Sequence, residues 1–460
     1  MPNADTPIDL MEPAVRPAAG TGRPAPGPIE PAGAPRQSFG PHGAWRPRPA
    51  FWTIQLAHTI VDIYPIFFAS LMLALKDRLG LDAWEIAVLY ATGPVVSGVP
   101  QVFFAWMTDK LDSRIFGWLG LAVGAVCICS IGLAQSFWQL WLLQLVGMLA
   151  TGAFHPVCAA LAGQLGGALR PGLSRSSARA WGVAVFYTAG MAGGFLGAML
   201  CTRINDALGM VHLLWLLPPG LAAALALWAA THAIPHRHAN HSELHAAIPP
   251  AEARQRWWAV TLLFWSNVQR FTTNTALPIL FAIWAESRIP GDISAATKLN
   301  GNLLAALTVG MGICGLLAGR LSPVGREKRS MIALTLIGAV AISLCGYLGD
   351  LVGVTGMYVM AALSAIGFAA IIPTTISLAQ RLLPGRTGLA SGLMLGTAWG
   401  LSFLAPVLTE WFIGARLDVA HLMPAQAINR GFVGFGCLLL LSAVLTAMIP
   451  GSILRKVAEN

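Results

Sequence analysis

Two ionisable side chains stand inside a stretch long enough to cross a membrane. Residues 51–75 read FWTIQLAHTIVDIYPIFFASLMLAL, and at about 1.5 Å per residue such a helix spans the apolar core of a bilayer. His58 and Asp62 lie near its centre, four residues apart and therefore on one helical face. A carboxylate there costs about 2.5–3.5 kcal/mol on insertion scales and normally faces a polar pathway. We predict that the pair carries protons, ions or substrate; a polar contact that only packs helices is the alternative.

Two more ionisable side chains fall near the middle of other apolar stretches. His155 lies about eighteen residues into residues 137–165, and Arg270 lies about thirteen residues into residues 257–285. At about 1.5 Å per residue, both are predicted to lie close to the middle of the membrane, as Asp62 is. A histidine titrates near pH 6.5, which suits proton transfer, whereas an arginine stays charged and suits binding an anion or a carboxylate.

The composition requires elements that position these residues inside a membrane. Of the 460 residues, 11% are charged and 56% are hydrophobic, with a mean hydropathy of +0.65. Soluble domains carry about 25% charged residues, so the chain is predicted to be a multi-pass membrane protein. Its seven cysteines all lie within apolar stretches, which argues against a disulfide framework and for small packing residues.

The apolar stretches predict an all-α fold with twelve transmembrane helices. They cover about residues 51–75, 85–107, 115–134, 137–165, 180–202, 211–231, 257–285, 299–319, 331–349, 354–380, 388–412 and 431–451. Most are joined by short loops, so neighbouring helices are expected to run antiparallel.

Two polar segments precede and divide these helices. Residues 1–49 are rich in Pro, Gly, Ala and Arg and have no apolar run, which predicts a disordered tail. Residues 232–256 split the chain into two six-helix halves, residues 50–231 and 257–460. Five histidines of this segment could bind a metal ion, although a solvated linker is the interpretation we favour: His232, His236, His238, His241 and His245.

The basic residues indicate how the chain is oriented. If both termini lie on one face, that face carries 21 of the 29 lysines and arginines, and the opposite face carries 7, with Arg270 inside a helix. Cytoplasmic loops of membrane proteins carry the excess of Lys and Arg. Both termini and the central linker are therefore predicted to be cytoplasmic, and this placement explains the net charge of +9 without a nucleic-acid partner.

The two halves resemble each other. AWMTDKLDSR (residues 105–114) separates the second and third helices, and GLLAGRLSPVGREKR (residues 315–329) separates the eighth and ninth. Both place small residues at the end of a helix before a basic cluster. A duplicated six-plus-six arrangement is typical of transporters that work by alternating access.

The AWMTDKLDSR loop resembles the signature loop of the major facilitator superfamily. Three further pieces resemble the fosmidomycin-resistance branch of that superfamily: His58 with Asp62, the Phe-His-Pro triplet that contains His155, and SGLMLGTAWG at residues 391–400. Val157 stands where that branch carries an acid, so the resemblance does not extend to its substrate. The resemblance covers the chain from about residue 51.

The resemblance implies a major facilitator fold whose first, fourth, seventh and tenth helices line a central cavity. Asp62, His155 and Arg270 would then face one another across the two halves. Asp62 and His58 are the proton-coupling candidates, and a static Asp62–Arg270 pair is the alternative. The substrate-binding candidates are His155, Arg270, Asn267, Asn274, Tyr64, Tyr187 and Trp399.

The resemblance also implies a cytoplasmic gate. In the superfamily the aspartate of the signature loop contacts the start of the eleventh helix, which carries the partial positive charge of a helix N-terminus. A solvated basic turn is the alternative. The gate candidates are Asp109, Lys110, Asp112, Arg114 and Arg386.

Together these features predict a secondary transporter that exports a small molecule by proton-coupled alternating access. We expect a monomer in a bacterial inner membrane, without a cofactor. Two alternatives stay open: a soft-metal (copper-type) importer using His58, His155 and Cys158, with Met148 on the same face, and an accessory protein that transports nothing. The sequence contains no nucleotide-binding loop or nucleophile elbow, so we do not expect an enzyme.

Overall fold

The computed structural model describes residues 46–111, 114–170, 172, 175–232, 234, 248–321 and 325–459. These residues fold into helices and contain no strand, and they belong to one compact unit. Residues 1–45 of the predicted tail and residues 233 and 235–247 of the predicted linker lie outside the described part.

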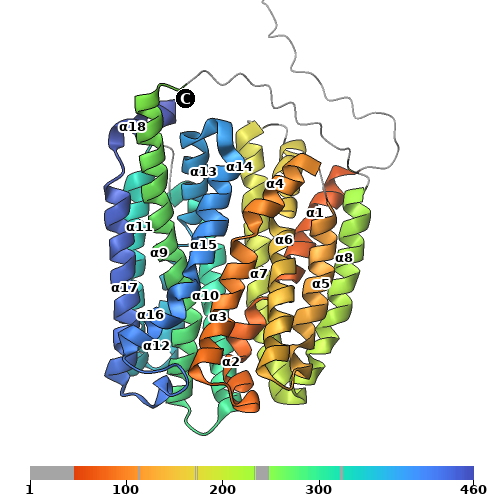
Figure 1. Ribbon diagram of the computed structural model, residues 1–460, viewed down its shortest axis with the longest axis vertical. Coiled ribbons are helices and arrows are strands. Elements are labelled where there is room, and N and C mark those ends of the chain that lie inside the picture. The colour runs from red at the N-terminus through yellow and green to blue at the C-terminus, as the bar shows by residue number, and fades with distance from the viewer. Residues whose placement is uncertain are drawn as a thin grey trace, which may run out of the picture. The chain divides into compact units, whose positions relative to one another are not determined.

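The first half of the described chain forms one group of helices, drawn from red to yellow-green in Figure 1. Its elements are α1 (Pro47–Ile63), α2 (Ile66–Leu79), α3 (Ala83–Gly98), α4 (Gln101–Leu111), α5 (Ile115–Cys129), η1 (Ser130–Leu133), α6 (Phe137–Leu169), α7 (Arg175–Leu208), η2 (Met210–Leu216) and α8 (Leu217–His232).

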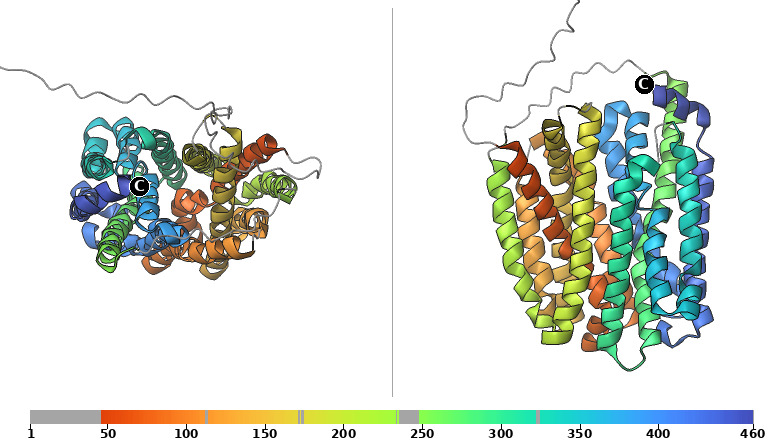
Figure 2. Two further views of the ribbon diagram at one scale, coloured as in Figure 1. Left: turned by 90° about the horizontal axis from the view of Figure 1, so that it is seen from above. Right: turned by 180° about the vertical axis from the view of Figure 1, so that it is seen from behind.

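The second half forms a group of green and blue helices beside the first (Figures 1 and 2). Its α-helices are α9 (Pro250–Arg288), α10 (Ile293–Leu321), α11 (Glu327–Val352), α12 (Val354–Ser364), α13 (Ile372–Leu382), α14 (Thr387–Ser391), α15 (Ala398–Gly400), α16 (Ala405–Ile413), α17 (Ala425–Ala447) and α18 (Gly451–Glu459). Short turns connect them: η3 (Ala365–Gly367), η4 (Pro384–Arg386), the π-helical turn η5 (Gly392–Thr397), η6 (Leu401–Leu404) and η7 (Ala420–Leu422).

The helices agree with the twelve predicted membrane spans. Among the described residues, eleven helical segments are long and apolar enough to cross a membrane. The remaining predicted span, residues 257–285, lies inside the 39-residue helix α9, whose Asn267, Arg270 and Asn274 lower its hydropathy. We count α9 as the twelfth span because it packs against α17, α10 and α13 in the same bundle.

Two predicted boundaries were wrong. The first helix begins at Pro47, within the predicted tail of residues 1–49, because proline is well tolerated in the first turn of a helix. Residues 250–256 belong to α9 and not to a linker. Arg256 and Glu252 pair at 2.7 Å within this first part of α9, so polar residues that resembled a linker in sequence instead extend the helix beyond the apolar region.

Local signals explain how the first span is bent and ended. Pro65 separates α1 from α2, because proline lacks the amide hydrogen that would continue the helix. Gly80 ends α2 in a left-handed conformation, with φ of 62°. Asp82 then starts α3 by accepting a hydrogen bond from the Glu85 amide at 2.8 Å, which satisfies a free N–H of the new helix.

The two halves are joined by polar contacts at the end of the bundle away from α18. Asn300 of α10 donates to the Ala69 carbonyl of α2 at 2.8 Å. Lys298 of α10 pairs with Asp206 of α7 at 2.9 Å. These contacts hold the halves together at the end opposite the start of α1 (Figure 1).

Glycines bring the halves together elsewhere. A Cβ atom on Gly98 of α3 would lie 2.7 Å from the Gly400 amide nitrogen and 2.8 Å from the Gly396 carbonyl oxygen. The α3 backbone thus touches η5 and α15 directly, which only small residues allow.

Candidate functional site

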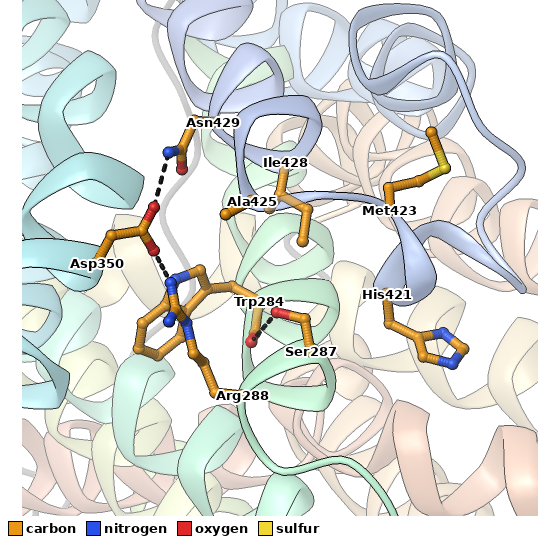
Figure 3. A pocket seen from close by; sticks show the side chains of 9 residues that line it. All are labelled: Trp284, Ser287, Arg288, Asp350, His421, Met423, Ala425, Ile428 and Asn429. Atoms are coloured by element: carbon orange, nitrogen blue, oxygen red, sulfur yellow. Dashed lines mark hydrogen bonds and ion pairs between the residues drawn. The ribbon is translucent and has the colours of Figure 1, made fainter.

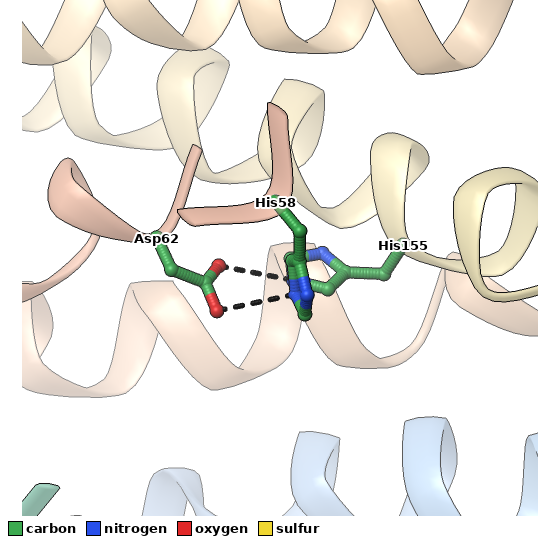
Figure 4. A group of neighbouring side chains, drawn as sticks. All are labelled: His58, Asp62 and His155. Atoms are coloured by element: carbon green, nitrogen blue, oxygen red, sulfur yellow. Dashed lines mark hydrogen bonds and ion pairs between the residues drawn. The ribbon is translucent and has the colours of Figure 1, made fainter. Parts of the chain in front are cut away.

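His58, Asp62 and His155 form one cluster, here called the Asp62 cluster (Figure 4). The Nε2 atom of His155, on α6, lies 3.1 Å from Asp62 Oδ1. The Nε2 atom of His58 lies 3.3 Å from Asp62 Oδ2, four residues along α1. Each carboxylate oxygen therefore faces one imidazole. The predicted proximity of Asp62 to His58, and of Asp62 to His155, is observed.

The other nitrogen of each imidazole is held by a backbone carbonyl. His58 Nδ1 lies 2.6 Å from the Phe186 oxygen of α7, and the Phe186 ring stacks on the His58 ring with centroids 3.6 Å apart. His155 Nδ1 lies 2.7 Å from the Thr151 oxygen, one turn earlier on α6. Because a carbonyl oxygen can only accept, each Nδ1 carries a hydrogen and donates it.

Glycines of α7 make room for the cluster. A Cβ atom at Gly190 would lie 2.6 Å from His58 Cε1 and 2.8 Å from His58 Nε2. A Cβ atom at Gly193 would lie 3.0 Å from Asp62 Cβ. Thr59 of α1 also donates to the Ala189 carbonyl at 3.0 Å. The α1–α7 contact is thus close enough to enclose a carboxylate between two helices.

The three side chains of the cluster differ in exposure. Exposed fractions of the side chains rise from 5% for His58 through 16% for Asp62 to 27% for His155. Phe154 and Phe186 stack against the His58 ring and shield it. His155 is therefore the most exposed member of the cluster.

Arg270 does not face Asp62, so the predicted arrangement of three facing charges was wrong. Its guanidinium is fully buried in the second half and donates to hydroxyl oxygens of α9, α11 and α17, listed here with their distances: Ser266 at 2.6 Å, Thr335 at 3.2 Å and Thr446 at 3.0 Å. Since α11 and α17 pack on each other, Arg270 points into the core of its own half. Among the described residues it forms no ion pair.

The two asparagines predicted to bind substrate, Asn267 and Asn274, have different surroundings. Asn267 Oδ1 accepts a hydrogen bond from Arg270 at 3.2 Å, and its Nδ2 donates to Thr375 at 2.9 Å, so Asn267 is part of the buried Arg270 network. Asn274 is partly exposed. Its neighbour Thr275 shares a 2.8 Å hydrogen bond with Ser402. Asn274 remains a candidate for contact with a transported molecule.

The three predicted aromatic residues also have different surroundings. Tyr64 is buried and donates from its hydroxyl to the Leu216 carbonyl at 3.1 Å, so it packs inside the first half and not in a cavity. Tyr187 is partly buried on α7, beside Gly315 of α10. Trp399 packs against a small apolar cluster that contains Val268 and Phe271 of α9.

The gate prediction remains untested. The side chains of Asp109 and Lys110, and all of Asp112, lie outside the described residues. Arg114 donates to the Thr231 carbonyl at 2.7 Å, so part of its guanidinium binds the end of α8. Arg386 is exposed in η4.

A second ionic group, here called the Lys76 cluster, was missed by the sequence reasoning. Lys76 of α2 pairs with Glu286 of α9 at 2.7 Å and donates to the Asp418 carbonyl at 3.1 Å. His421 Nδ1 of η7 lies 3.4 Å from Glu286 Oε2. Burial lowers the pKa of His421, with Lys76 acting in the same direction. The sequence feature that could have predicted this cluster is the pair of opposite charges at the corresponding ends of the first and seventh helices.

A pocket of about 150 Å³ lies near the Lys76 cluster within the second half (Figure 3). Its wall includes His421 and Trp284. Arg288 forms an ion pair with Asp350, and Asn429 donates to Asp350 Oδ2 at 2.9 Å. These polar groups bind one another, so the pocket lacks a free charged wall for a ligand.

The Asp62 cluster is where a cation could be held. Its three donor atoms lie within 4.8 Å of one another, and no other described set of three or more His, Cys, Asp or Glu side chains does so. The alternative soft-metal site was predicted to include the sulfur atoms of Cys158 and Met148, and this part of the prediction was wrong. Cys158 Sγ points toward Gly117 of α5, and Met148 Cε points toward Gly93 of α3.

The comparisons with known proteins agree with this architecture. The family description Major Facilitator Superfamily matches residues 66–406. The Fosmidomycin resistance protein of Escherichia coli (strain K12) is 24% identical over 379 residues, which covers 80% of this chain and 85% of the relative. The uncharacterised MFS-type transporter YfnC of Bacillus subtilis (strain 168) is 22% identical over 386 residues, covering 82% and 88%.

Solved structures show the same fold. A bacterial homologue of the human drug peptide transporters PepT1 and PepT2 gives a TM-score of 0.64 at 13% identity, covering 89% of this chain and 99% of that one. A bacterial homologue of the human lysosomal transporter Spinster, in an inward-facing and occupied conformation, gives a TM-score of 0.54 at 15% identity, covering 89% and 96%.

Proposed function

Because this chain belongs to the Major Facilitator Superfamily, we propose that it exports a small molecule in exchange for protons. The observation that carries this proposal is the Asp62 cluster, in which a carboxylate is enclosed between two imidazoles inside membrane-spanning helices. An intramembrane ionisable group of this kind is by default a functional site.

In the proposed cycle, Asp62 and His58 hold protons while His155 faces the transported molecule. His155 has the most exposed side chain of the three. A molecule that reaches it would compete for the contact between His155 and Asp62 and so promote proton release. Asn274, Tyr187 and Trp399 are the remaining candidates for contact with that molecule, because they are partly exposed along α9, α7 and α15.

Arg270 and Asn267 have a different role in this proposal. Their hydrogen bonds all run to other residues of the second half, so we assign them to holding that half together. Asp109, Lys110, Asp112, Arg114 and Arg386 remain the proposed cytoplasmic gate, on the sequence pattern alone.

We place the protein in a bacterial inner membrane with both termini in the cytoplasm. The charge asymmetry of 21 against 7 basic residues supports this orientation. The start of α1 and helix α18 lie at the same end of the bundle (Figure 1), as a chain with an even number of spans requires.

The test is proton release from purified protein in detergent while a compound panel is titrated. Fosmidomycin is included because a relative is named for resistance to it. We expect release from the wild type and none from Asp62→Asn. The matched control is Asp77→Asn, which makes the same change at an exposed carboxylate of α2. Release that persists in Asp62→Asn would refute the coupling role.

If the wild type releases no protons with any compound, proton antiport is wrong and two other outcomes become decisive. Binding of a divalent metal ion by the wild type, lost in Asp62→Asn, would indicate a metal transporter. Stable capture of one partner protein together with no transport in proteoliposomes would indicate an accessory protein.

A further inference from the structure

We infer that the Asp62 cluster binds one divalent metal ion of the zinc class, held by Nε2 of His58, Nε2 of His155 and the Asp62 carboxylate (Figure 4). The site goes beyond the proposed function, because it requires the positions of these atoms and not proton coupling. A bound ion occupies the atoms to which the proposed function assigns protons. It therefore inhibits transport, and this consequence alone rests on the proposed function.

Both imidazoles turn the ring nitrogen that carries a lone pair toward Asp62. Nδ1 of His58 donates to the Phe186 carbonyl at 2.6 Å, and Nδ1 of His155 donates to the Thr151 carbonyl at 2.7 Å. A neutral imidazole carries its hydrogen on one nitrogen only, so Nε2 is left to accept a hydrogen bond or bind a metal ion. Histidines that bind metal ions in proteins almost always donate their other N–H to a carbonyl, a carboxylate or water, which fixes the ring and its tautomer.

The Nε2 atom of His58 has no hydrogen-bond partner among the described residues. It lies 3.3 Å from Asp62 Oδ2 in a side chain that is only 5% exposed. On the other side of the carboxylate, His155 Nε2 and Asp62 Oδ1 share a hydrogen bond of 3.1 Å. A buried polar atom without a partner is unfavourable. One ion between the three side chains binds His58 Nε2 as well, and it displaces the hydrogen that His155 and Asp62 share.

The distances between the ligand atoms suit an ion of this class. Zn²⁺ binds imidazole nitrogen at about 2.0–2.1 Å and carboxylate oxygen at about 2.0–2.2 Å, with tetrahedral geometry, so that two of its ligands lie about 3.3 Å apart. The observed distances from Nε2 to the carboxylate are 3.3 Å for His58 and 3.1 Å for His155. All three ligand atoms lie within 4.8 Å of one another, so a small movement of the side chains completes the set and leaves the fourth position to water.

The donor atoms select the class of ion. Imidazole nitrogens with a carboxylate suit Zn²⁺ or Ni²⁺, whereas Mg²⁺ and Ca²⁺ take mainly oxygen ligands and Cu⁺ takes sulfur. The nearest candidate sulfur atoms point elsewhere: Cys158 Sγ faces Gly117, and Met148 Cε faces Gly93. In the described part of the chain, the ion pairs of Asp62 are those with the two histidines, so neither lysine nor arginine neutralises the carboxylate there.

Aromatic rings surround the His58 ligand. The rings of Phe154 and Phe186 stack on the His58 ring, with centroids 5.8 Å and 3.6 Å away. An apolar shell of this kind limits solvent access to a metal site, and the low dielectric constant strengthens the attraction between the ion and a carboxylate.

The test is binding of Zn²⁺ alone to the purified full chain, which carries an affinity tag without histidine. Histidine-rich segments can bind metal ions independently, so the five histidines of residues 232–245 are replaced in every protein: His232→Gln, His236→Gln, His238→Gln, His241→Gln and His245→Gln. Isothermal titration calorimetry then gives the stoichiometry and affinity of this parent protein. We expect saturable binding of one ion per chain.

Three substitutions in the parent remove one ligand each: His58→Gln, His155→Gln and Asp62→Asn. We expect each to weaken Zn²⁺ binding by more than the about 10–100-fold that loss of an outer-shell partner causes. The matched control is His421→Gln, which removes another imidazole that lies beside a carboxylate, 3.4 Å from Glu286 Oε2, and should leave the affinity unchanged. Thermal unfolding in detergent shows whether each variant is folded.

X-ray absorption at the zinc edge identifies the ligands in the parent protein, even if a variant fails to fold. We expect nitrogen and oxygen ligands only, two of them imidazoles. A sulfur ligand at about 2.3 Å overturns the inferred site. So does the absence of saturable binding, or an affinity equal to that of the parent in any of the three folded variants.

The metal site and the proposed function fail in different ways. If Zn²⁺ binds as expected but Asp62→Asn still releases protons with a compound, the site stands and the proposed function is wrong. If no ion binds but Asp62→Asn abolishes proton release, proton coupling stands and the site is wrong. If both hold, Zn²⁺ abolishes the compound-driven proton release of the parent protein. Transport of Zn²⁺ into proteoliposomes would keep the site and replace the proposed cargo.

Discussion

At the scale of single residues, Gly190 decides whether α7 can lie against the Asp62 cluster. We predict that Gly190→Ala destabilises the protein by about 1–3 kcal/mol, the usual effect of overpacking, because its Cβ would lie 2.6 Å from a His58 ring atom. Gly194→Ala is the control, since its Cβ would meet only the Thr308 methyl group at 3.2 Å. Thermal unfolding in detergent measures both. Equal unfolding temperatures for the two variants would contradict the proposed contact.

Arg270 provides a second prediction at this scale. Arg270→Lys replaces a guanidinium that reaches several acceptors by an ammonium that cannot, and a lost hydrogen bond to a charged group costs about 1.5–3 kcal/mol. We expect a lower unfolding temperature and unchanged proton release per folded molecule. The same substitution at exposed Arg203 should have little effect. If the variant folds normally but loses proton release, Arg270 belongs to the transport site instead.

For these residues, the sequence predicted the depth of each side chain in the membrane well and its direction around the helix axis poorly. Helical spacing placed His58 and Asp62 on one face, and position along each span placed His155 at the same depth. For Arg270 the sequence does not show in which direction around the helix axis the side chain points. Buried hydroxyls from Thr335 and Thr446, which are far away in sequence, satisfy its guanidinium and turn it away from Asp62.

At the scale of elements, the Lys76 cluster joins α2 to α9 and η7. We predict that Lys76→Glu opens this end of the bundle, because Glu286 would then face a like charge. Adding Glu286→Lys should close it again. Labelling of Ser70→Cys by a water-soluble maleimide measures opening, since Ser70 is fully buried beside Asn300. Equal labelling of the single and double charge variants would exclude this role.

The same cluster predicts a pH dependence. Burial lowers the pKa of His421 below its usual value of about 6.5. Neutral His421 therefore stabilises the closed contact fully above about pH 6.5, and this stabilisation is lost as the pH falls through the lowered pKa. Protonated His421 would also lie 3.5 Å from Lys76 Nζ, while Glu286 and Asp418 partly offset the charge. Since the maleimide reacts with the thiolate, labelling at each pH is divided by that of the same protein after denaturation. We expect this ratio for Ser70→Cys to rise from pH 7 to pH 5.

His421→Gln supplies the control for that pH dependence. An uncharged side chain at this position should leave the labelling of Ser70→Cys, divided by that of the denatured protein at each pH, nearly constant from pH 7 to pH 5. If the variant shows the same rise as the parent protein, another group carries the titration and His421 does not.

Elements were the best predicted level of the structure. Long apolar runs ended by Gly80 or restarted by Asp82 define helices without knowledge of the fold. The sequence was less informative where a helix is made of polar residues. Residues 250–256 read as linker, yet Glu252 binds both Arg256 and Lys456 of α18, so contacts made only after folding extend α9.

At the scale of the whole molecule, the orientation in the membrane can be tested directly. We predict that a fluorescent reporter fused after Asn460 is active inside the cell and that alkaline phosphatase at the same position is inactive. A fusion inserted at Gly291, in the turn between α9 and α10, should give the opposite result. Active alkaline phosphatase after Asn460 would invert the proposed orientation.

The duplicated plan was visible in the sequence, but the contacts that close one end were not. Repeated motifs at residues 105–114 and 315–329 indicate two related halves. Lys76 and Glu286 are 210 positions apart, and such pairs depend on how the two halves lie against each other. Small free-energy differences decide that arrangement in a transporter, and no local pattern records them.

The ionisable residues of the Asp62 cluster come only from α1 and α6, and α7 encloses them. The second half contributes Asn274 and Trp399 but none of the titrating groups. Under the proposed function, mutations in the second half would therefore change which molecules are carried and leave the proton-binding groups unchanged. On the same proposal, relatives that carry different molecules would be expected to vary on α9 and α15 and to keep the ionisable residues of α1 and α6.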